Sequence, residues 1–150
     1  MKCTFVVCLS LLLFFISAAH ATIRHVRPDG TGEYATIRAA IAACLPGDVV
    51  ELSDGIYTGA DNRNLSFLGK AITVRSAGDD PRSCVIDCQN ASTGFTFVSG
   101  ETASSVLRGI TVQNGEASSG GALSFSGASP RIEKCVFRNS HAAYGGALYT

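Results

Sequence analysis

One stretch of this sequence occurs twice without an internal gap, and this repeat limits the fold more than any other feature. Residues 105–125 align with residues 130–150 over their whole length. A period of about 25 residues is typical of solenoids, in which each repeat forms one coil that stacks on the next. Apolar residues, an asparagine and a glycine pair recur at equivalent positions, namely Leu107/Ile132, Ile110/Cys135, Val112/Phe137, Asn114/Asn139 and Gly120-Gly121/Gly145-Gly146.

The rest of the chain from residue 48 onward alternates short apolar segments with turn residues, a pattern that indicates strands. No helical segment separates them, which argues against doubly wound α/β folds and leaves a sandwich, a barrel or a β-solenoid. A sandwich has no reason to repeat side-chain types at fixed spacing. We therefore predict an all-β, right-handed parallel β-helix, open and incomplete at its C-terminal end. The predicted strands are residues 49–52, 65–68, 72–75, 85–88, 95–98, 107–112, 122–125, 132–137 and 147–149.

A fainter copy of the repeat lies upstream of the first clear one, and it predicts which side chains stack between coils. Equivalent residues of stacked coils lie about 4.8 Å apart, so they touch. We expect a row of asparagines at a turn, where this residue tolerates left-handed backbone angles, and glycine pairs at the next corner. The predicted inward stacks are Ile86–Ile110–Cys135 and Cys88–Val112–Phe137, and the asparagine row is Asn90–Asn114–Asn139. Arg108 and Glu133 also fall on equivalent positions and are expected to pair outside.

One segment near the N-terminus has helical spacing. Ile37 and Ile41 lie one helical turn apart, Thr36 is suited to an N-cap, and Pro46-Gly47 ends the pattern. A strand at residues 23–26 precedes this helix, predicted for residues 36–45. The first coil of a solenoid has an exposed apolar end and free strand edges, so we expect the helix to cover them.

Residues 1–21 have the pattern of a cleaved signal peptide. Lys2 is followed by an apolar run over residues 4–19 and by Ala19-His20-Ala21, a small-x-small cleavage site. A membrane anchor is the alternative, but the run is short for a span of about 20 residues and no basic cluster follows it. No second apolar run of membrane length follows, so no span is predicted in the mature chain. We therefore predict cleavage after Ala21 and a secreted or surface-displayed protein, with a strand and capping helix at residues 22–47 and truncated β-helix coils at residues 48–150.

Charge and cysteine content exclude two further classes. The formal net charge is zero, so binding of nucleic acid through a strongly basic field is excluded. Cys84 and Cys88 are the only close cysteine pair after residue 21, and in a strand they are too far apart to share a zinc ion. We interpret Cys44, Cys84, Cys88 and Cys135 mostly as buried hydrophobic residues. A Cys44–Cys84 disulfide stays open.

Several segments resemble known secreted β-helix proteins. Residues 26–37, with Gly47-Asp48-Val49-Val50 and Gly55-Ile56-Tyr57, resemble the opening of the pectin-lyase-like superfamily and are also similar to the opening of pectin methylesterases. Residues 129–132, residues 135–139 and the Gly-Gly-Ala-Leu copies resemble repeats of large bacterial surface β-helix proteins and of polymorphic outer membrane proteins. The resemblance implies the fold over nearly all of the mature chain. It implies no single activity, because this fold hosts lyases, hydrolases, esterases, adhesins and inert surface proteins.

No catalytic, cofactor-binding or metal-binding residues are predicted anywhere in the chain. Asp87 points outward, but its expected equivalents, Thr111 and Val136, add no charge, and His25 and His141 are isolated in the sequence. We predict a non-catalytic, monomeric scaffold that is carbohydrate-binding or adhesive, with a polysaccharide or cell-surface glycan as partner. The alternative is the N-terminal part of a pectate-lyase-like enzyme acting on acidic polysaccharide, which would need calcium ligands and a basic proton acceptor.

Overall fold

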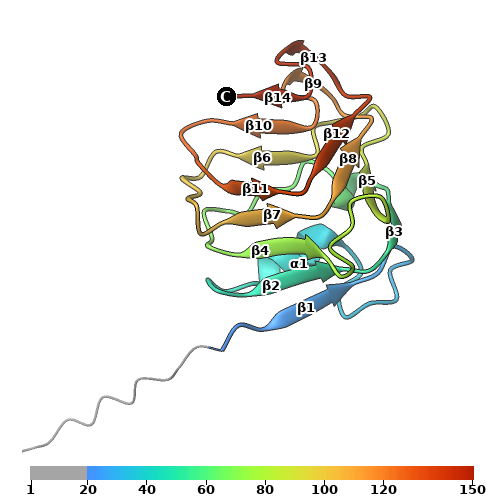
Figure 1. Ribbon diagram of the computed structural model, residues 1–150, viewed down its shortest axis with the longest axis vertical. Helices are drawn as coiled ribbons and strands as arrows, with labels where there is room; N and C mark the ends of the chain where they lie inside the picture. Colours follow the sequence, from blue (N-terminus) through green and yellow to red (C-terminus); the bar gives the residue numbers. More distant parts are fainter. Residues whose placement is uncertain (1–19) are drawn as a thin grey trace, which may run out of the picture.

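The protein is a parallel β-solenoid of about five turns, as the computed structural model shows (Figure 1). The structure describes residues 20–150, so the predicted signal peptide lies almost entirely outside the described residues. Every pair of neighbouring strands is parallel. The all-β parallel β-helix expected from the repeat is therefore confirmed.

Four parallel sheets run along the stack of coils. Sheet A consists of β1 (Ile23–Val26), β2 (Val49–Leu52), β4 (Thr73–Ser76), β7 (Val106–Arg108) and β11 (Arg131–Glu133). Sheet B consists of β3 (Gly55–Tyr57), β5 (Cys84–Asp87), β8 (Thr111–Gln113) and β12 (Val136–Arg138). Sheet C contains β6 (Phe95–Phe97), β10 (Leu123–Phe125) and β14 (Leu148–Tyr149), and sheet D contains β9 (Glu116–Ser119) and β13 (His141–Tyr144).

Each copy of the clear repeat corresponds to one coil. Val112 lies opposite Phe137 in sheet B, and Leu123 lies opposite Leu148 in sheet C, as the ungapped alignment requires. Two expected strands, residues 107–112 and 132–137, are each divided in two. The corners are Gly109, with φ of 68°, and Lys134, with φ of 50°, and these left-handed residues turn the chain from sheet A into sheet B.

The fainter copy of the repeat predicted the wrong register between β5 and β8. Ile86 lies opposite Val112, so the expected stack of Ile86 on Ile110 does not form. The inward row is instead Tyr57–Ile86–Val112–Phe137, and Cys88 does not belong to it. The turn after β5 is longer than the turn after β8, and this compensates for the difference between the observed and the predicted register of the two strands. The Asn90 N–H therefore still donates to the Asn114 carbonyl, at 2.8 Å.

The asparagine positions share a backbone conformation rather than a side-chain ladder. Asn90, Asn114 and Asn139 have φ values of 51°, 54° and 52°, all in the left-handed region where asparagine is favoured. The Asn114 amide donates to the Asp87 carboxylate, at 3.0 Å from Oδ1, and not to the other asparagines. Gly120 and Gly145 are also left-handed, and a Cβ atom at either would collide with the carbonyl three positions ahead.

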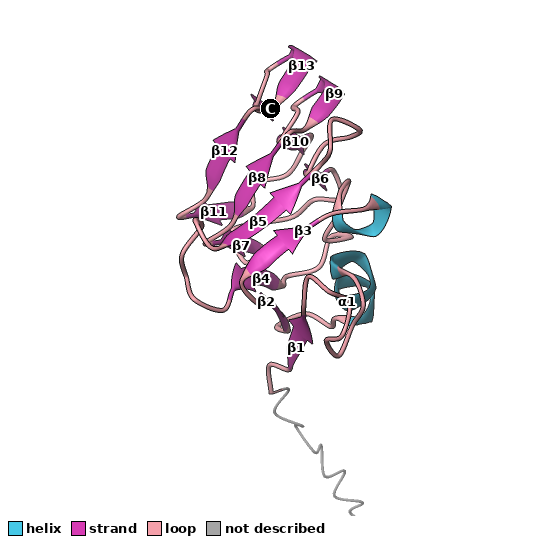
Figure 2. Cartoon of the chain, turned by 90° about the vertical axis from the view of Figure 1, so that its right-hand side faces the viewer, coloured by secondary structure: helices cyan, strands magenta, loops and turns pink. Residues whose placement is uncertain are grey.

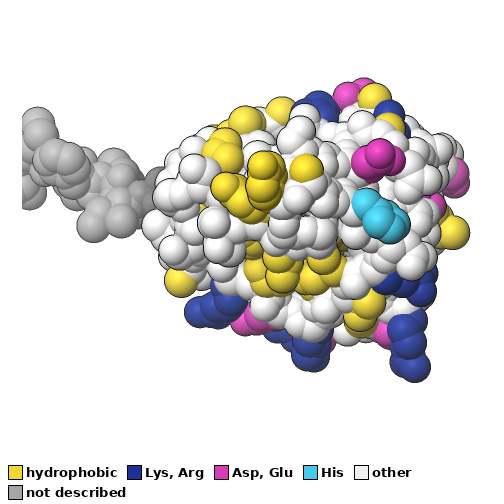
Figure 3. All heavy atoms as spheres, turned by 90° about the horizontal axis from the view of Figure 1, so that it is seen from above, with side chains coloured by type: hydrophobic (Ala, Val, Ile, Leu, Met, Phe, Trp, Pro, Cys, Tyr) yellow, Lys and Arg dark blue, Asp and Glu magenta, His cyan; other side chains and the backbone are white. Residues whose placement is uncertain are grey.

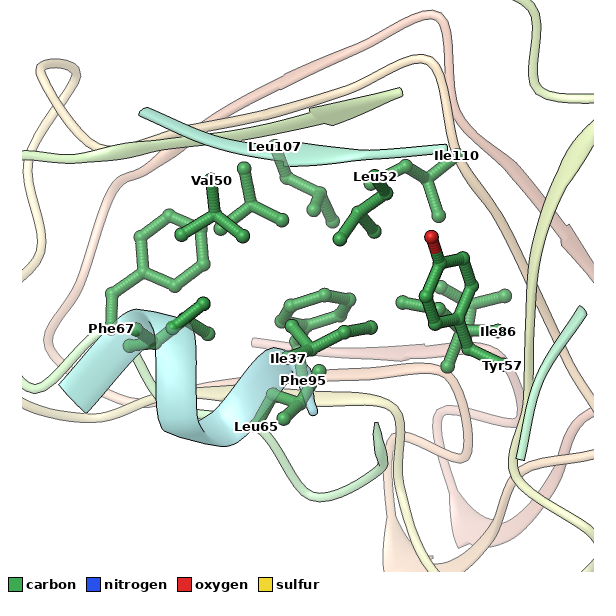
Figure 4. Close-up of a cluster of buried hydrophobic side chains, with 14 of the residues drawn as sticks. Ile37, Val50, Leu52, Tyr57, Leu65, Phe67, Ile86, Phe95, Leu107 and Ile110 are labelled. Carbon is green, nitrogen blue, oxygen red and sulfur yellow. The ribbon is translucent and has the colours of Figure 1, made fainter. Parts of the chain in front are cut away.

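The interior is a continuous apolar core along the coil axis (Figure 4). Phenylalanines of sheet C and the segment before it pack ring against ring. Phe97 contacts Phe67 at 5.1 Å between centroids and stacks on Phe125 at 5.4 Å.

Phe67 lies in the predicted strand 65–68, which instead makes only a single bridge, from Leu65 to Phe95. The strands β3, β9 and β13 were not predicted.

The N-terminal helix α1 (Ile37–Ala43) packs against β1, β2 and the short 3-10 helix η1 (Ala60–Asn62), at the N-terminal end of the stack (Figure 2). The Thr36 hydroxyl accepts from the Ala39 N–H at 3.2 Å, as expected of an N-cap. The helix ends earlier than predicted, and Cys44 is already extended. Leu45 precedes Pro46, a position from which the helical conformation is disfavoured.

The four cysteines between residues 20 and 150 are free thiols, so the Cys44–Cys84 disulfide that the sequence left open is not formed. Cys44, Cys84 and Cys88 are buried, and Cys135 is partly buried. Burial raises the pKa of both Cys84 and Cys88 to about 12. These thiols therefore stay protonated at neutral pH and pack as small apolar side chains.

Candidate functional site

The outer face of sheet A carries a row of charged side chains, one from each coil. His25, Glu51, Arg75, Arg108 and Glu133 lie opposite one another on successive strands. Alternate residues of a strand point to opposite faces, so these side chains project outward while Val50, Val74 and Leu107 fill the core between them. The row places two arginines on neighbouring coils.

Each of the two arginines is held by a carboxylate. Arg75 donates from Nη2 and Nε to Glu51 Oε2, at 2.7 and 3.1 Å. Arg108 makes a two-pronged contact with Asp79, at 2.7 Å from Nε to Oδ1 and 2.8 Å from Nη2 to Oδ2. The expected contact of Arg108 with Glu133 is also present, but it is longer, at 3.5 Å.

Asp79 is the centre of this network. It lies in the turn after β4, with a left-handed φ of 53°, and it accepts from both Arg108 and Lys134. These hydrogen bonds, Arg108 first, hold the pKa of the Asp79 carboxyl well below its ordinary value. Through these ionic contacts Asp79 joins three successive coils.

A small pocket opens beside this network. It has a volume of about 220 Å³ and is lined by Arg75, Ser76, Ala77, Asp79 and Arg108. The two arginine side chains are each 40% exposed, so solvent and solutes can reach them. The pocket therefore combines two accessible guanidinium groups with one ionised carboxylate.

The outer face of sheet B carries a second polar row. Asp87, Gln113 and Arg138 lie opposite one another on three successive coils. Arg138 Nε donates to Gln113 Oε1 at 2.8 Å, and Gln113 Nε2 donates to Asp87 Oδ2 at 3.0 Å. The prediction that Thr111 and Val136 are the equivalents of Asp87 is wrong, because β5 pairs with β8 in a register shifted from the one that the fainter repeat copy indicated.

Asp87 is ionised within this row. Partial burial raises its pKa, but hydrogen bonds from the Gln89 N–H and from the Asn114 and Gln113 amides outweigh burial and lower the pKa below its ordinary value. The carboxylate therefore acts as a fixed acceptor at neutral pH. A general acid would need the opposite shift.

The two histidines expected to be isolated have carboxylate neighbours. His25 Nδ1 lies 3.4 Å from Glu51 Oε1, and His141 lies opposite Glu116 on the adjacent coil.

Within residues 20–150, no group of three or more His, Cys, Asp or Glu side chains is placed to hold a metal ion. In the same part of the chain, no helix combines the length and apolar character that crossing a bilayer requires.

The sequence analysis missed Arg75, Gln113 and Arg138 as members of these rows, and Ser76 as a residue of the pocket. Gln113 and Arg138 occupy equivalent positions of the two clear repeat copies, so the repeat contained this signal. Arg75 and Arg108 are separated by a longer stretch of chain, because two long turns are inserted in that coil, and no period in the sequence relates them.

None of the protein-family models, curated proteins or solved structures compared with this chain matches it.

Proposed function

We propose that this chain is an exported β-solenoid scaffold that binds a glycan on its outer surface and has no catalytic role in this segment. The observation that carries the proposal is the row Asp87–Gln113–Arg138, in which side chains from three coils are held by one another at 2.8 and 3.0 Å. Carboxylate, amide and guanidinium groups are suited to hydrogen bonding with sugar hydroxyls. Because the coils lie about 4.8 Å apart, the three groups form a line along the stack, to which an extended polymer can bind.

The sequence supports export and a place in the pectin-lyase-like superfamily. The signal-peptide pattern of residues 1–21 directs the chain to the secretory route, and cleavage after Ala21 leaves β1 as the first element. The segments that resemble secreted β-helix proteins include the turn before α1 and residues 135–139, which contain Arg138 of the sheet B row. A secreted or surface location would bring this row into contact with glycans.

The absence of catalysis is proposed from the state of the carboxylates. Asp79, beside Arg108, and Asp87, beside Gln113, both have a lowered pKa and are held by several donors. Neither is able to supply a proton at neutral pH, and neither is free to rotate towards a substrate. A fixed, ionised carboxylate suits hydrogen bonding to a sugar hydroxyl better than it suits general acid catalysis.

Glycan binding by the full secreted chain, measured on immobilised neutral and acidic polysaccharides, tests the proposal. Replacement of Gln113 and Arg138 by alanine removes two members of the row without touching the core. The matched control replaces Thr96 and Ser124 by alanine, because these residues lie opposite each other on the outer face of sheet C. We expect at least a tenfold loss of affinity in the first variant and less than a twofold change in the second.

Two outcomes would overturn this function. The first is that no polysaccharide is retained by the folded wild-type chain. The second is release of unsaturated sugar products from polygalacturonate with calcium, followed by ultraviolet absorbance, which would assign the lyase alternative instead.

A further inference from the structure

We infer that Asp48 is the binding site for the α-ammonium group that cleavage after Ala21 creates on Thr22, so that processing of the chain also stabilises the N-terminal end of the solenoid. This inference rests on the export in the proposed function, and it is independent of glycan binding. Three features support it: the contact between Thr22 and Asp48, the fixed Asp48 carboxylate, and the residue at which the solenoid begins to hold the chain.

The nitrogen that cleavage releases already contacts the Asp48 carboxylate. In the uncleaved chain, the Thr22 amide N–H donates to Asp48 Oδ1 at 2.9 Å. Hydrolysis of the Ala21–Thr22 bond adds the hydroxyl of water to the Ala21 carbonyl carbon and its proton to the Thr22 nitrogen, which becomes an amine. An α-amino group has an ordinary pKa of about 7.7–8.0, so most of it is protonated at neutral pH. The hydrogen bond of a neutral amide therefore becomes an ion pair.

Thr22 is also the first residue that the solenoid holds. Its carbonyl accepts from the Val49 N–H at 2.9 Å, and β1 pairs with β2 from Ile23 onward (Figure 1). Ala21, in contrast, is exposed and makes no hydrogen bond within residues 20–150. The small residues of the signal sequence predict cleavage at the same peptide bond. Two independent observations therefore place the boundary between Ala21 and Thr22.

The Asp48 carboxylate is fixed and ionised. It is only 5% exposed, and its second oxygen, Oδ2, accepts from the Leu45 N–H and from Arg24 Nη2, both at 2.9 Å. The N–H groups of Leu45 and Thr22, followed by Arg24, lower the pKa of Asp48 to about 2, against the effect of burial. A carboxylate that is already desolvated, oriented and charged gives the ammonium group a prepared partner.

Arg24 is the other cation at this carboxylate, and it limits the strength of the new pair. Arg24 Nη2 contacts Oδ2, whereas the Thr22 nitrogen contacts Oδ1, so the two cations do not compete for one oxygen. Two positive charges then face one negative charge, and their repulsion offsets part of the attraction. We therefore expect the α-amino pKa of the folded chain to rise from its ordinary value to about 9, and no further.

Three further titratable side chains face this corner of the solenoid. Tyr34 lies in the turn before α1 and accepts from Arg24 Nη1 at 2.7 Å. Cys44 lies at the end of α1, and burial raises the pKa of its thiol, which stays neutral. Lys70 Nζ donates at 2.9 Å to two carbonyls at the end of the same helix, which hold its charge there. We therefore expect the pH dependence of the new pair to come from Thr22 and Asp48.

Comparison of two secreted forms of the full chain tests the inference. The first is the wild type, expressed with residues 1–21 in a secreting host. The matched control has one alanine inserted between Ala21 and Thr22, so that cleavage after Ala21 leaves the ammonium group one residue, about 3.8 Å, farther along the chain. Mass spectrometry identifies the first residue of each product. Asp48→Asn is made in both forms, which completes a double-mutant cycle.

Urea unfolding and an NMR titration of the α-amino group measure the pair. At pH 6, we expect the unfolding equilibrium constant of the wild type to be about tenfold lower than that of the control, because a rise of one in the pKa corresponds to a factor of ten. With Asp48→Asn, the two forms should differ less than about twofold. The α-amino pKa should be about 9 in the wild type and ordinary in the control.

The tenfold advantage should fade in both directions of pH. The ammonium group has a raised pKa in the folded chain, so its stabilising effect is complete below about pH 8 and is lost as the pH rises through about 9. Asp48 has a lowered pKa, so the effect is present above about pH 4 and is lost as the pH falls towards 2. An advantage that stays constant from pH 5 to pH 10 would contradict an ion pair.

The outcomes separate this inference from the proposed function. Equal stability of the wild type and the control, with an ordinary α-amino pKa, would overturn the pair and leave export and glycan binding intact. An advantage that persists with Asp48→Asn would show that another group is responsible, and would also overturn it. A product that keeps residues 1–21 would overturn both this inference and the proposed export. If the pair forms but no polysaccharide is retained, the inference stands and only the glycan binding fails.

Discussion

Within residues 20–150, the first and last coils of the stack differ in how well they are covered. At the N-terminal end, α1 places Ile37 and Ile41 over the first coils, with exposed fractions of 0% and 2%. At the other end, Figure 3 shows hydrophobic side chains open to solvent on the last coil. Leu148 is 46% exposed there, although its equivalent one coil earlier, Leu123, is fully buried.

This difference shows that the repeat alone does not bury a residue in a solenoid. Leu123 and Leu148 occur in the same Gly-Gly-Ala-Leu sequence and the same strand position. Leu123 has a coil on both sides, with Phe95 opposite it on one side and Leu148 on the other. In the described part of the chain, Leu148 has a neighbour only on one side. Burial in such a fold is therefore a property of coil pairs.

The largest expected effect comes from placing a charge at Val112. Val112→Asp would bury an unpaired carboxylate between Ile86 and Phe137 and should lower the free energy of unfolding by several kcal/mol. Phe137→Asp, at the equivalent position of the last coil, should cost clearly less, because its side chain is only partly buried. Urea denaturation followed by circular dichroism measures both. Equal losses would contradict the comparison of the two ends.

Truncation of the equivalent leucines gives the next largest effect. Leu123→Ala removes a fully buried side chain and should cost about 2–5 kcal/mol. Leu148→Ala should cost less than about 1 kcal/mol, because the side chain is already 46% exposed. The difference between the two in thermal or urea unfolding is the measurement. If Leu148→Ala were as costly as Leu123→Ala, the last coil would be covered in solution.

The N-cap of α1 tests the covered end. Thr36→Ala removes the acceptor for the Ala39 N–H and should lower the free energy of unfolding by about 1 kcal/mol. Thr36→Ser keeps the hydroxyl and is the matched control, with an expected change of only a few tenths of a kcal/mol. Loss of stability in both variants to the same extent would show that the methyl group, and not the cap, is responsible.

Acid should weaken the covered end through Asp48. The N–H groups of Leu45 and Thr22, with Arg24, lower the pKa of Asp48 from 3.8 to about 2. The ionised form is therefore favoured in the folded state, so its stabilising effect is present above about pH 4 and is lost as the pH falls towards 2. Asp48→Asn should destabilise the protein at pH 6, and the difference from the wild type should shrink towards zero at pH 2. A constant difference across this range would contradict the assignment.

Contacts in the candidate site could be predicted from the repeat only where the coils are regular. Between the last two coils, the ungapped alignment predicts the Val112–Phe137 contact, and it also relates Gln113 to Arg138. Between the earlier coils the offset changes, because Ile86 meets Val112 and Arg75 meets Arg108 across turns of different length. The repeat therefore could not predict that Arg75 lies opposite Arg108, and so it could not predict the pocket between them.

The parallel solenoid, the strand at its start and the capped helix that follows could all be read from the amino-acid sequence. Spacing of apolar residues, turn residues and an N-cap are local signals, and each acts within a few residues of its own position. The packing of the folded chain was needed to establish which coil residues face one another where the turns differ in length. A turn can absorb extra residues without moving the strands, and the register is then set by inter-strand hydrogen bonds and by burial of alternate side chains. For this reason Ile86 faces Val112, and Arg75 lies beside Arg108.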